Sequence, residues 1–268
     1  MSFANCRIST QRGFTLIEVV MVIVITGILA GMGAMLLVKP MQGYVDLTTR
    51  TSLVESAESA LRRMQRDVRQ ALPNSVRIGG AGTRLEILHS TDGGRYRHNG
   101  AGDKLDFSKV DDGFDVLGSL RVAPNAGERA IIYNLAAGGT TGNAYAGDNS
   151  ALIGSGSTVS YVALDPTFRF PRPSPQQRFF VVDGPVSFVF DAGAGTLTRY
   201  SGYPIALSQP SGFPPGSGSL LADHVSGCQF TYAAGTSERA GLVTMRLTLS
   251  RGGETVTLLH QVHVVNVP

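Results

Sequence analysis

Three successive patterns of hydrophobic and polar positions divide the chain. The first is a run from Val19 to Val38, 20 residues without a charged side chain. A helix of about 20 apolar residues spans the hydrocarbon core of a bilayer. Arg7 and Arg12 precede the run without any acid, and a short basic head favours the cytoplasmic side for the N-terminus. The sequence therefore predicts one membrane-spanning helix, with the rest of the chain exported.

The second pattern, in residues 40–73, is that of an amphipathic helix. Apolar residues recur there at steps of three, four and seven, which places them on one helical face. They are Leu47, Val54, Ala57, Leu61, Met64, Val68 and Ala71. Joined to the apolar run, this segment predicts one long helix from about Thr15 to Leu72, with a bend near Pro40 or Gly43. We expect the apolar face of its second half to pack on a sheet.

The third pattern fills residues 74–268 with short β-strand signals. Runs such as "TRLEILH", "KLDFS", "QRFFVVD", "VSFVFD" and "LVTMRLTLS" combine β-forming residues with alternation, and Gly- and Pro-rich stretches separate them. These runs predict a mainly antiparallel β-sheet head domain, divided into two sheet regions near residues 165–178. With the helix, the expected fold class is α+β.

The apolar run begins directly after an acid, Glu18, and two simple explanations of the run fail on this point or on its length. A secretory signal peptide has an apolar core of roughly 7–15 residues followed by a small-residue cleavage site. Here the run is longer, and its small residues lie inside it. A plain membrane anchor leaves Glu18 unexplained, because an acid in a spanning segment is costly and is a functional candidate by default.

The stretch "RGFTLIEVVMVIVITGILA" resembles the class III signal of type IV pilins and type II secretion pseudopilins. The family has a short basic leader ending in Gly, then Phe, then Thr-Leu-Ile-Glu and an apolar stretch. The resemblance implies a leader of residues 1–13, cut from the chain between Gly13 and Phe14 by a membrane prepilin peptidase that also N-methylates Phe14. It implies that residues 14–39 anchor the subunit in the inner membrane and later form the filament core.

The same resemblance gives Glu18 a role in assembly. A mature N-terminus at Phe14 carries an amine in apolar surroundings, where an ammonium and a carboxylate are each unfavourable and pairing offsets part of that penalty. We expect Glu18 of one subunit to pair with the Phe14 amine of a neighbour and to set the axial register. The alternative is that Glu18 only reaches the lipid headgroups.

Further segments, among them "AESALRRMQRDVRQALPNSVRI" and "QRFFVVDGPVSF", resemble minor pilins of MSHA (mannose-sensitive haemagglutinin) pilus biogenesis. This implies a pilin-like fold and a role in initiation or at the tip, with the prepilin peptidase, other minor pilins, the major pilin and the inner-membrane assembly platform as partners. The J-type minor pseudopilin of type II secretion is an alternative within the class. A tip-displayed adhesin or ligand-binding module is an alternative from another class.

Charge and cysteine content narrow the possibilities. Loss of Arg7 and Arg12 with the leader lowers the formal net charge from +3 to +1, which gives no reason to expect nucleic-acid binding. Cys6 leaves with the leader, so Cys228 remains alone and is expected to be a buried thiol. The MSHA resemblance implies a second cysteine near "FVFD", where this chain has Phe190, so a disulfide is not expected.

Catalytic and metal-binding patterns are weak. His260 and His263 lie three apart in a strand pattern, so their side chains point to opposite faces. No nucleophile elbow, phosphate-binding loop or paired-carboxylate motif is evident, and we expect no enzyme activity and no cofactor. An alternative is calcium bound in a head-domain loop by acids that lack EF-hand spacing, namely Asp103, Asp106, Asp111, Asp112 and Asp115.

Overall fold

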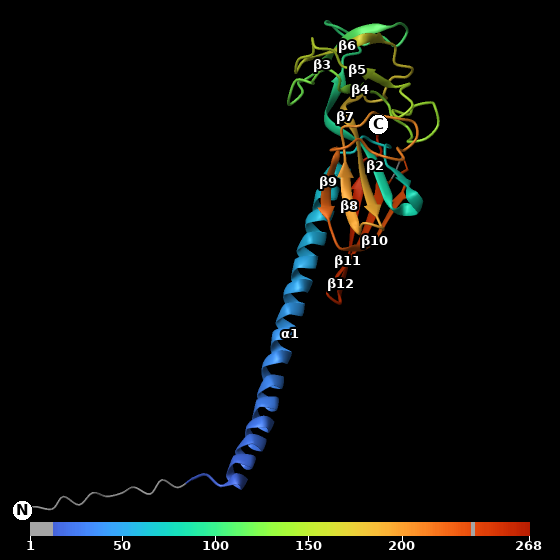
Figure 1. Ribbon diagram of the computed structural model, residues 1–268. Coiled ribbons are helices and arrows are strands. Elements are labelled where there is room, and N and C mark those ends of the chain that lie inside the picture. The colour runs from blue at the N-terminus through green and yellow to red at the C-terminus, as the bar shows by residue number, and fades with distance from the viewer. Residues whose placement is uncertain (1–12, 237–238) are drawn as a thin grey trace, which may run out of the picture. The chain divides into compact units, whose positions relative to one another are not determined.

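The computed structural model describes residues 13–236 and 239–268, and the side chains of residues 34–40 are outside that description. The predicted leader, apart from Gly13, therefore lies outside the described residues. The chain divides into two compact units, Met1–Thr49 and Arg50–Pro268. The second unit contains the end of the long helix and all the strands (Figure 1).

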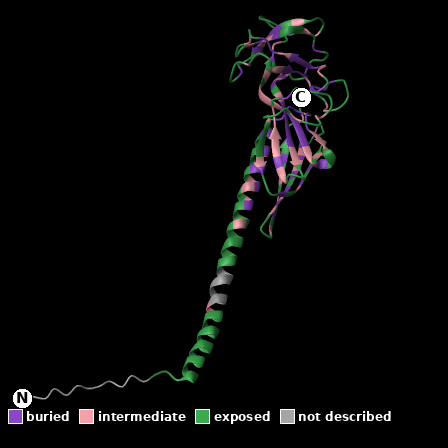
Figure 2. Cartoon of the chain, in the orientation of Figure 1, coloured by how far each residue is buried: buried purple, intermediate pink, exposed green. Residues whose placement is uncertain are grey.

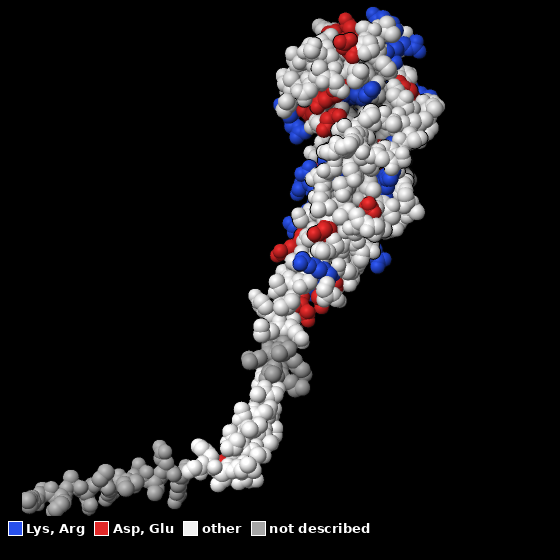
Figure 3. All heavy atoms as spheres, in the orientation of Figure 1, with Lys and Arg blue, Asp and Glu red and all other residues white. Residues whose placement is uncertain are grey.

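Helix α1 (Leu16–Arg69) has 54 residues. It continues through Gly43, where a bend was one of the expectations, without an interruption of the helix. Leu16–Gly33 is long and apolar enough to cross a membrane by length and composition, with a mean hydropathy of 2.4. Figure 3 shows the surface of this first part of the helix as almost free of charged side chains. The helix ends at Arg69, three residues before the expected Leu72, because Ala71 already forms a β-bridge with His89.

The second part of α1 packs one face into the head. Leu61, Met64 and Val68 are buried in the main core cluster, and Val54 is partly buried against it. Leu53, Ala57 and Ala60 complete the buried stripe, which Figure 2 shows in purple near the end of the helix. Leu47, expected on this face, is 64% exposed. Its spacing continues the apolar periodicity, but burial of the face begins only at Leu53.

The described strands form two sheets. Within each sheet, all neighbouring strands pair in the antiparallel direction. The larger sheet has the order β5-β4-β7-β2-β3-β6, with β1 paired to β2 and β8 lying between β7 and β9. The smaller sheet has the order β10-β11-β12. The bounds are β1 (Arg77–Gly79), β2 (Arg84–Tyr96), β3 (Asp111–Leu117), β4 (Arg129–Ile131), β5 (Ser150–Leu152), β6 (Tyr161–Phe168), β7 (Arg178–Asp191), β8 (Thr196–Tyr200), β9 (Gly218–Ala222), β10 (Val225–Ala233), β11 (Gly241–Arg251) and β12 (Glu254–Val264). A 3-10 turn (Gly80–Gly82) follows β1.

Two strands, β2 and β7, run through both halves of the head (Figure 1). One end of the pair meets β1 and β8, and the other meets β3 and β4. The sequence patterns predict that "TRLEILH" and "GRYRHN" are separate strands, with Gly93 between them, and that "QRFFVVD" and "VSFVFD" are separate strands, with Gly184 between them. The glycines lie inside the strands instead, and a Cβ at Gly94 would come 3.1 Å from Phe179 Cε1. Gly94 therefore permits close packing across the sheet.

The head contains two principal hydrophobic cores. The first joins the buried stripe of α1 to the inner faces of both sheets, including Phe188, Met245 and Leu249. The second lies among β3 to β6 and the start of β7, with Phe114 and Phe179 meeting edge to face at 5.0 Å between ring centroids. The expected boundary near residues 165–178 is wrong, because β2 and β7 each contribute to both cores.

The segment 104–108, expected as a strand, lies in a loop, whereas Asp111–Leu117 forms β3. The acid-rich stretch thus contributes a strand that pairs with β6. Gly113 is favoured there, because a Cβ would lie 2.7 Å from the backbone carbonyl oxygen of Val162.

Leu61→Asp should destabilise the protein by several kcal/mol, because it places an unpaired carboxylate at a fully buried position. Ser59→Asp, on the exposed face of the same helix, is the matched control. Thermal unfolding of the purified full-length chain in detergent measures both variants. Equal melting temperatures for the two would show that this face of α1 is not packed on the sheets.

Candidate functional site

The N-terminus of α1 is capped by the side chain of the residue that precedes the helix. Thr15 precedes the first helical residue, and its Oγ1 accepts the backbone N–H of Glu18 at 3.3 Å. The Thr15 carbonyl also accepts the N–H groups of Glu18 and Val19 at 3.1 and 3.2 Å. Thr-x-x-Glu is the capping-box spacing, and an acid in the first turn complements the helix dipole. This signal was present in the sequence, so Thr15 and Glu18 also have a local role in starting the helix.

The residues around the predicted cleavage point are open to their surroundings. Phe14 is 79% exposed, and Gly13 and Glu18 are also exposed. Within the described part of the chain, the Glu18 carboxylate has no hydrogen-bond or ion-pair partner.

The other end of α1 is tied to the head by a buried ion pair. Arg199 Nε on β8 lies 2.6 Å from Asp67 Oδ2, and the two side chains are only 16% and 6% exposed. Arg63, one turn earlier, approaches the other oxygen of Asp67 at 3.7 Å. Arg199 also donates from Nη1 to Ser201 Oγ at 3.0 Å. The apolar stripe holds α1 against the sheets, and this pair fixes where along β8 the helix lies.

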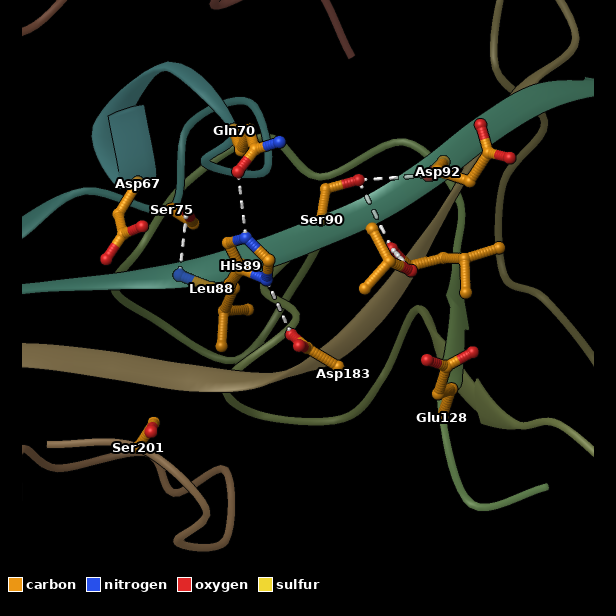
Figure 4. A network of polar contacts seen from close by, with 12 residues as sticks. Asp67, Gln70, Ser75, Leu88, His89, Ser90, Asp92, Glu128, Asp183 and Ser201 are labelled. Carbon is orange, nitrogen blue, oxygen red and sulfur yellow. Dashed lines mark hydrogen bonds and ion pairs between the residues drawn. The ribbon is translucent and has the colours of Figure 1, made fainter. Parts of the chain in front are cut away.

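A second polar network begins where α1 ends (Figure 4). The His89 ring lies between Asp183 Oδ1, 2.9 Å from Nδ1, and Gln70 Oε1, 3.1 Å from Nε2. The backbone carbonyl of Gln70 accepts the N–H of Ser90, and Leu72 N–H donates to the Leu88 carbonyl, both at 2.8 Å. The chain leaving the helix is thus bound to β2 at the irregularity in its pairing with β7.

A third polar cluster surrounds Arg77 and Glu86, and Arg77 also donates to the carbonyls of Ala206 and Leu207. Glu86 is 1% exposed and receives two hydrogen bonds from Arg77, at 3.0 and 3.1 Å. Burial raises the pKa of Glu86, and the Arg77 contacts offset only part of that rise. The Arg77 guanidinium lies 3.7 Å from the ring centre of Tyr145, whose hydroxyl donates to the Ser75 carbonyl. This cluster is closed to solvent and is best explained as support for the fold.

The candidate calcium loop is held together by its own hydrogen bonds. Asp115 Oδ2 pairs with Arg97 Nε at 3.2 Å and accepts the Asp103 N–H at 3.0 Å, while Asp111 accepts the N–H of Asp106 at 2.7 Å. Burial and the neighbouring acids Asp111, Asp112 and Asp115 raise the pKa of Asp103. Across the described residues, no group of three or more His, Cys, Asp or Glu side chains is arranged to hold a metal ion.

Cys228 is a free, buried thiol on β10. Burial raises its pKa to about 12, so the thiolate is scarce at neutral pH. His224, the histidine nearest to it in sequence, instead lies 3.7 Å from Asp223.

Comparison with known protein families identifies the N-terminal segment. Residues 8–34 match the family described as "Prokaryotic N-terminal methylation motif". No curated protein and no solved structure matches the chain. The matched segment contains Gly13, Phe14, Glu18 and the apolar start of α1. This motif supports a type IV pilin or pseudopilin.

More particularly, the motif implies processing by a prepilin peptidase and assembly with other pilins. Among the described residues, one helix is long and apolar enough to cross a membrane, and its place near the N-terminus suggests a membrane anchor.

Mass spectrometry of the membrane-extracted protein should find a mature chain that begins at N-methylated Phe14. Gly13→Glu should block cleavage, because a bulky charged residue replaces the small residue before the cut, whereas Gly13→Ala should still be processed. A mature wild-type chain that retains Met1 contradicts the assignment.

Arg199→Met should lower the free energy of unfolding by about 3–5 kcal/mol, because it leaves Asp67 buried without its nearest partner. Removing both charges, in Asp67→Leu with Arg199→Met, should be less harmful than Arg199→Met alone. The control is Arg62→Met, which breaks an exposed pair with Glu58 and should cost less than about 1 kcal/mol. Chemical denaturation measures all three, and equal losses for Arg199→Met and Arg62→Met would exclude a special role for the buried pair.

Proposed function

We propose that this protein is a minor pilin of an MSHA-type IV pilus, similar to the MSHA biogenesis protein MshO, and that it acts in pilus initiation or in the tip complex. The carrying observation is the match of residues 8–34 to the methylation motif, followed by a large β head. The MSHA assignment is supported by the sequence resemblance along the head. A head of this size, on Arg50–Pro268, favours a terminal position over repeated packing along a thin shaft.

In the proposed topology the N-terminus lies in the cytoplasm and the head in the periplasm. Leu16–Gly33 has 18 residues, which corresponds to about 27 Å of helix at 1.5 Å per residue. This is close to the thickness of a bilayer core, about 30 Å. Arg12 before the segment supports the same orientation.

The proposed role is structural, without catalysis or a bound cofactor. The raised pKa of the Cys228 thiol argues against a nucleophile at that position. His260 and His263 are half-buried and exposed, respectively, on an edge strand, and alternation sends their side chains to opposite faces. The three polar networks described above connect residues of the head to one another and to the end of α1, and so support the fold.

Two alternatives make different demands. A J-type minor pseudopilin of type II secretion would carry the same N-terminal chemistry and a similar head. An adhesin or ligand-binding module would use head loops such as 136–158 and 201–219. Affinity purification of the tagged full-length protein from its own cells, with identification of the retained minor subunits, distinguishes the MSHA-type minor pilin from the J-type minor pseudopilin. Glycan-array binding by the same protein tests the adhesin alternative.

In the proposed assembly, the Glu18 carboxylate pairs with the processed Phe14 amine of a neighbouring subunit. Its exposure and lack of a described partner within the chain support this role. The capping contact with Thr15 uses the backbone N–H of Glu18, so the carboxylate remains available.

Glu18→Ala protein should be inserted and cleaved normally but should fail to co-purify with sheared pili or minor-pilin partners. Removing the carboxylate leaves an ammonium unpaired in apolar surroundings, a loss of about 3–5 kcal/mol for a fully buried pair. Incorporation is normalised to the cleaved membrane pool. Glu55→Ala, an exposed acid farther along α1, is the control and should assemble normally. Wild-type incorporation of Glu18→Ala contradicts the pairing.

A further inference from the structure

A groove of about 500 Å³ lies beside the end of α1. Its walls come from the end of α1 and the residues that follow it, the second half of β2, the loop after β3, the start of β7 and the C-terminal tail after β12. These segments are distant in sequence and belong to the same compact unit. Arg69 and Arg178 of the lining belong to the two segments that resemble MSHA minor pilins, but Gly13, Phe14 and Glu18, the predicted processing and assembly residues, are not in the lining and do not explain its charge.

Arginine dominates the charge of the groove. Arg69, Arg95, Arg121 and Arg178 line it, and Asp92 is the one acid in its lining. Asp92 is already engaged: its Oδ1 lies 3.5 Å from Arg121 Nε, and its Oδ2 accepts the Arg121 backbone N–H at 2.7 Å. The other three arginines have no carboxylate within ion-pair distance in the described part of the chain. The groove therefore carries uncompensated positive charge.

Two of these arginines are neighbours on adjacent strands of the sheet. Arg95 of β2 and Arg178 of β7 are directly opposite in the antiparallel register. Like charges in directly opposed positions destabilise a sheet. Arg95 donates from Nε to the Gln176 carbonyl at 3.1 Å, which orients its guanidinium without neutralising it. A pair that weakens the sheet and has no internal counter-charge is best explained by a ligand that supplies one.

The groove also has an apolar side. Val265 and Val267 of the C-terminal tail are 58% and 43% exposed, and Phe180 is half-buried beside them. Arginine forks bind carboxylates through two parallel hydrogen bonds, and the exposed valines favour an apolar neighbour of those carboxylates. Phe179 in the floor is fully buried, so no freely exposed aromatic ring is available to stack on a nucleic-acid base.

We infer that this groove docks an acidic segment of a partner polypeptide, with Asp or Glu carboxylates on Arg95 and Arg178 and an apolar side chain on Val265 and Val267. Arg69 adds a further positive charge at the end of α1. The choice of a polypeptide rests on the assembly role proposed above, in which the partners are other pilins. The groove lies in the head, so it would recognise a partner independently of the Glu18 contact.

The test uses the full-length chain in nanodiscs of zwitterionic lipid and a fluorescent twelve-residue peptide containing four Glu and two Leu. We expect saturable binding that weakens as salt increases, because the contacts are partly exposed ion pairs. The same peptide with Gln in place of Glu should bind at least tenfold more weakly. Equal binding of the two peptides overturns the proposal.

Arg95→Ala with Arg178→Ala should reduce binding of the Glu peptide at least tenfold and should leave the melting temperature unchanged or raise it, because the opposed charges are removed. Arg246→Ala with Arg251→Ala removes the same total charge from exposed positions on β11 and is the matched control. Unchanged binding by the first double variant overturns the proposal. Loss of binding with a clear fall in melting temperature would instead assign these arginines a structural role and also overturns it.

Single-stranded DNA and alginate serve as competing polyanions in the same assay. Tighter binding of either one than of the Glu peptide, at equal salt, overturns the assignment to a polypeptide partner. These outcomes are independent of pilus assembly in cells. Failure of the groove therefore remains distinguishable from failure of the proposed minor-pilin function.

Discussion

Burial of one face of α1 is the constraint on which the head depends. Leu53, Leu61, Met64 and Val68 enter a core that both sheets share, and each such side chain contributes about 1.5–3 kcal/mol when fully buried. Without this helix face, the apolar side chains of the three-stranded sheet, such as Met245 and Leu249, would lose part of the core in which they are buried. The first part of the same helix is apolar on all sides and suits lipid or a filament interior. The same helix thus contains an apolar segment, Leu16–Gly33, that is exposed in the structure, and a later segment that packs into the core of the head.

Polar contacts give this packing its position. Hydrophobic burial is non-directional, so a helix held only by apolar contacts tolerates small shifts along a sheet. Asp67 and Arg199 connect α1 to one place on β8, and the network of Gln70, His89 and Asp183 connects the helix end to β2 and β7. These contacts set the direction in which the chain leaves the helix. Gln70, one member of this network, also lines the arginine-lined groove.

The two candidate interaction sites differ in the surroundings in which they act. In the proposed assembly Glu18 acts within the apolar segment, where exclusion of water would make a single charge pair strong. The groove is open to solvent, where individual ion pairs are weak and several arginines have to act together. An assembly contact of the first kind is suited to holding subunits in a common register. A contact of the second kind is suited to selecting a partner, because charge complementarity contributes more to specificity than to affinity.

The sequence alone determined the N-terminal methylation motif, the membrane-length helix, the apolar face at Leu61, Met64 and Val68, and the predominance of β-strands after residue 74. Each depends on neighbouring residues or on a short period, so local sequence carries it. The tertiary structure decided that burial starts at Leu53 and leaves Leu47 exposed, because periodicity does not reveal where a packing partner ends. It decided that β2 continues through Gly93 and Gly94 as one strand, because the close approach that favours glycine there comes from Phe179 on β7. The groove was also beyond the sequence: Arg69, Arg95, Arg121 and Arg178 are separated along the chain, and only the pairing of β2 with β7 beside the end of α1 brings their charges together.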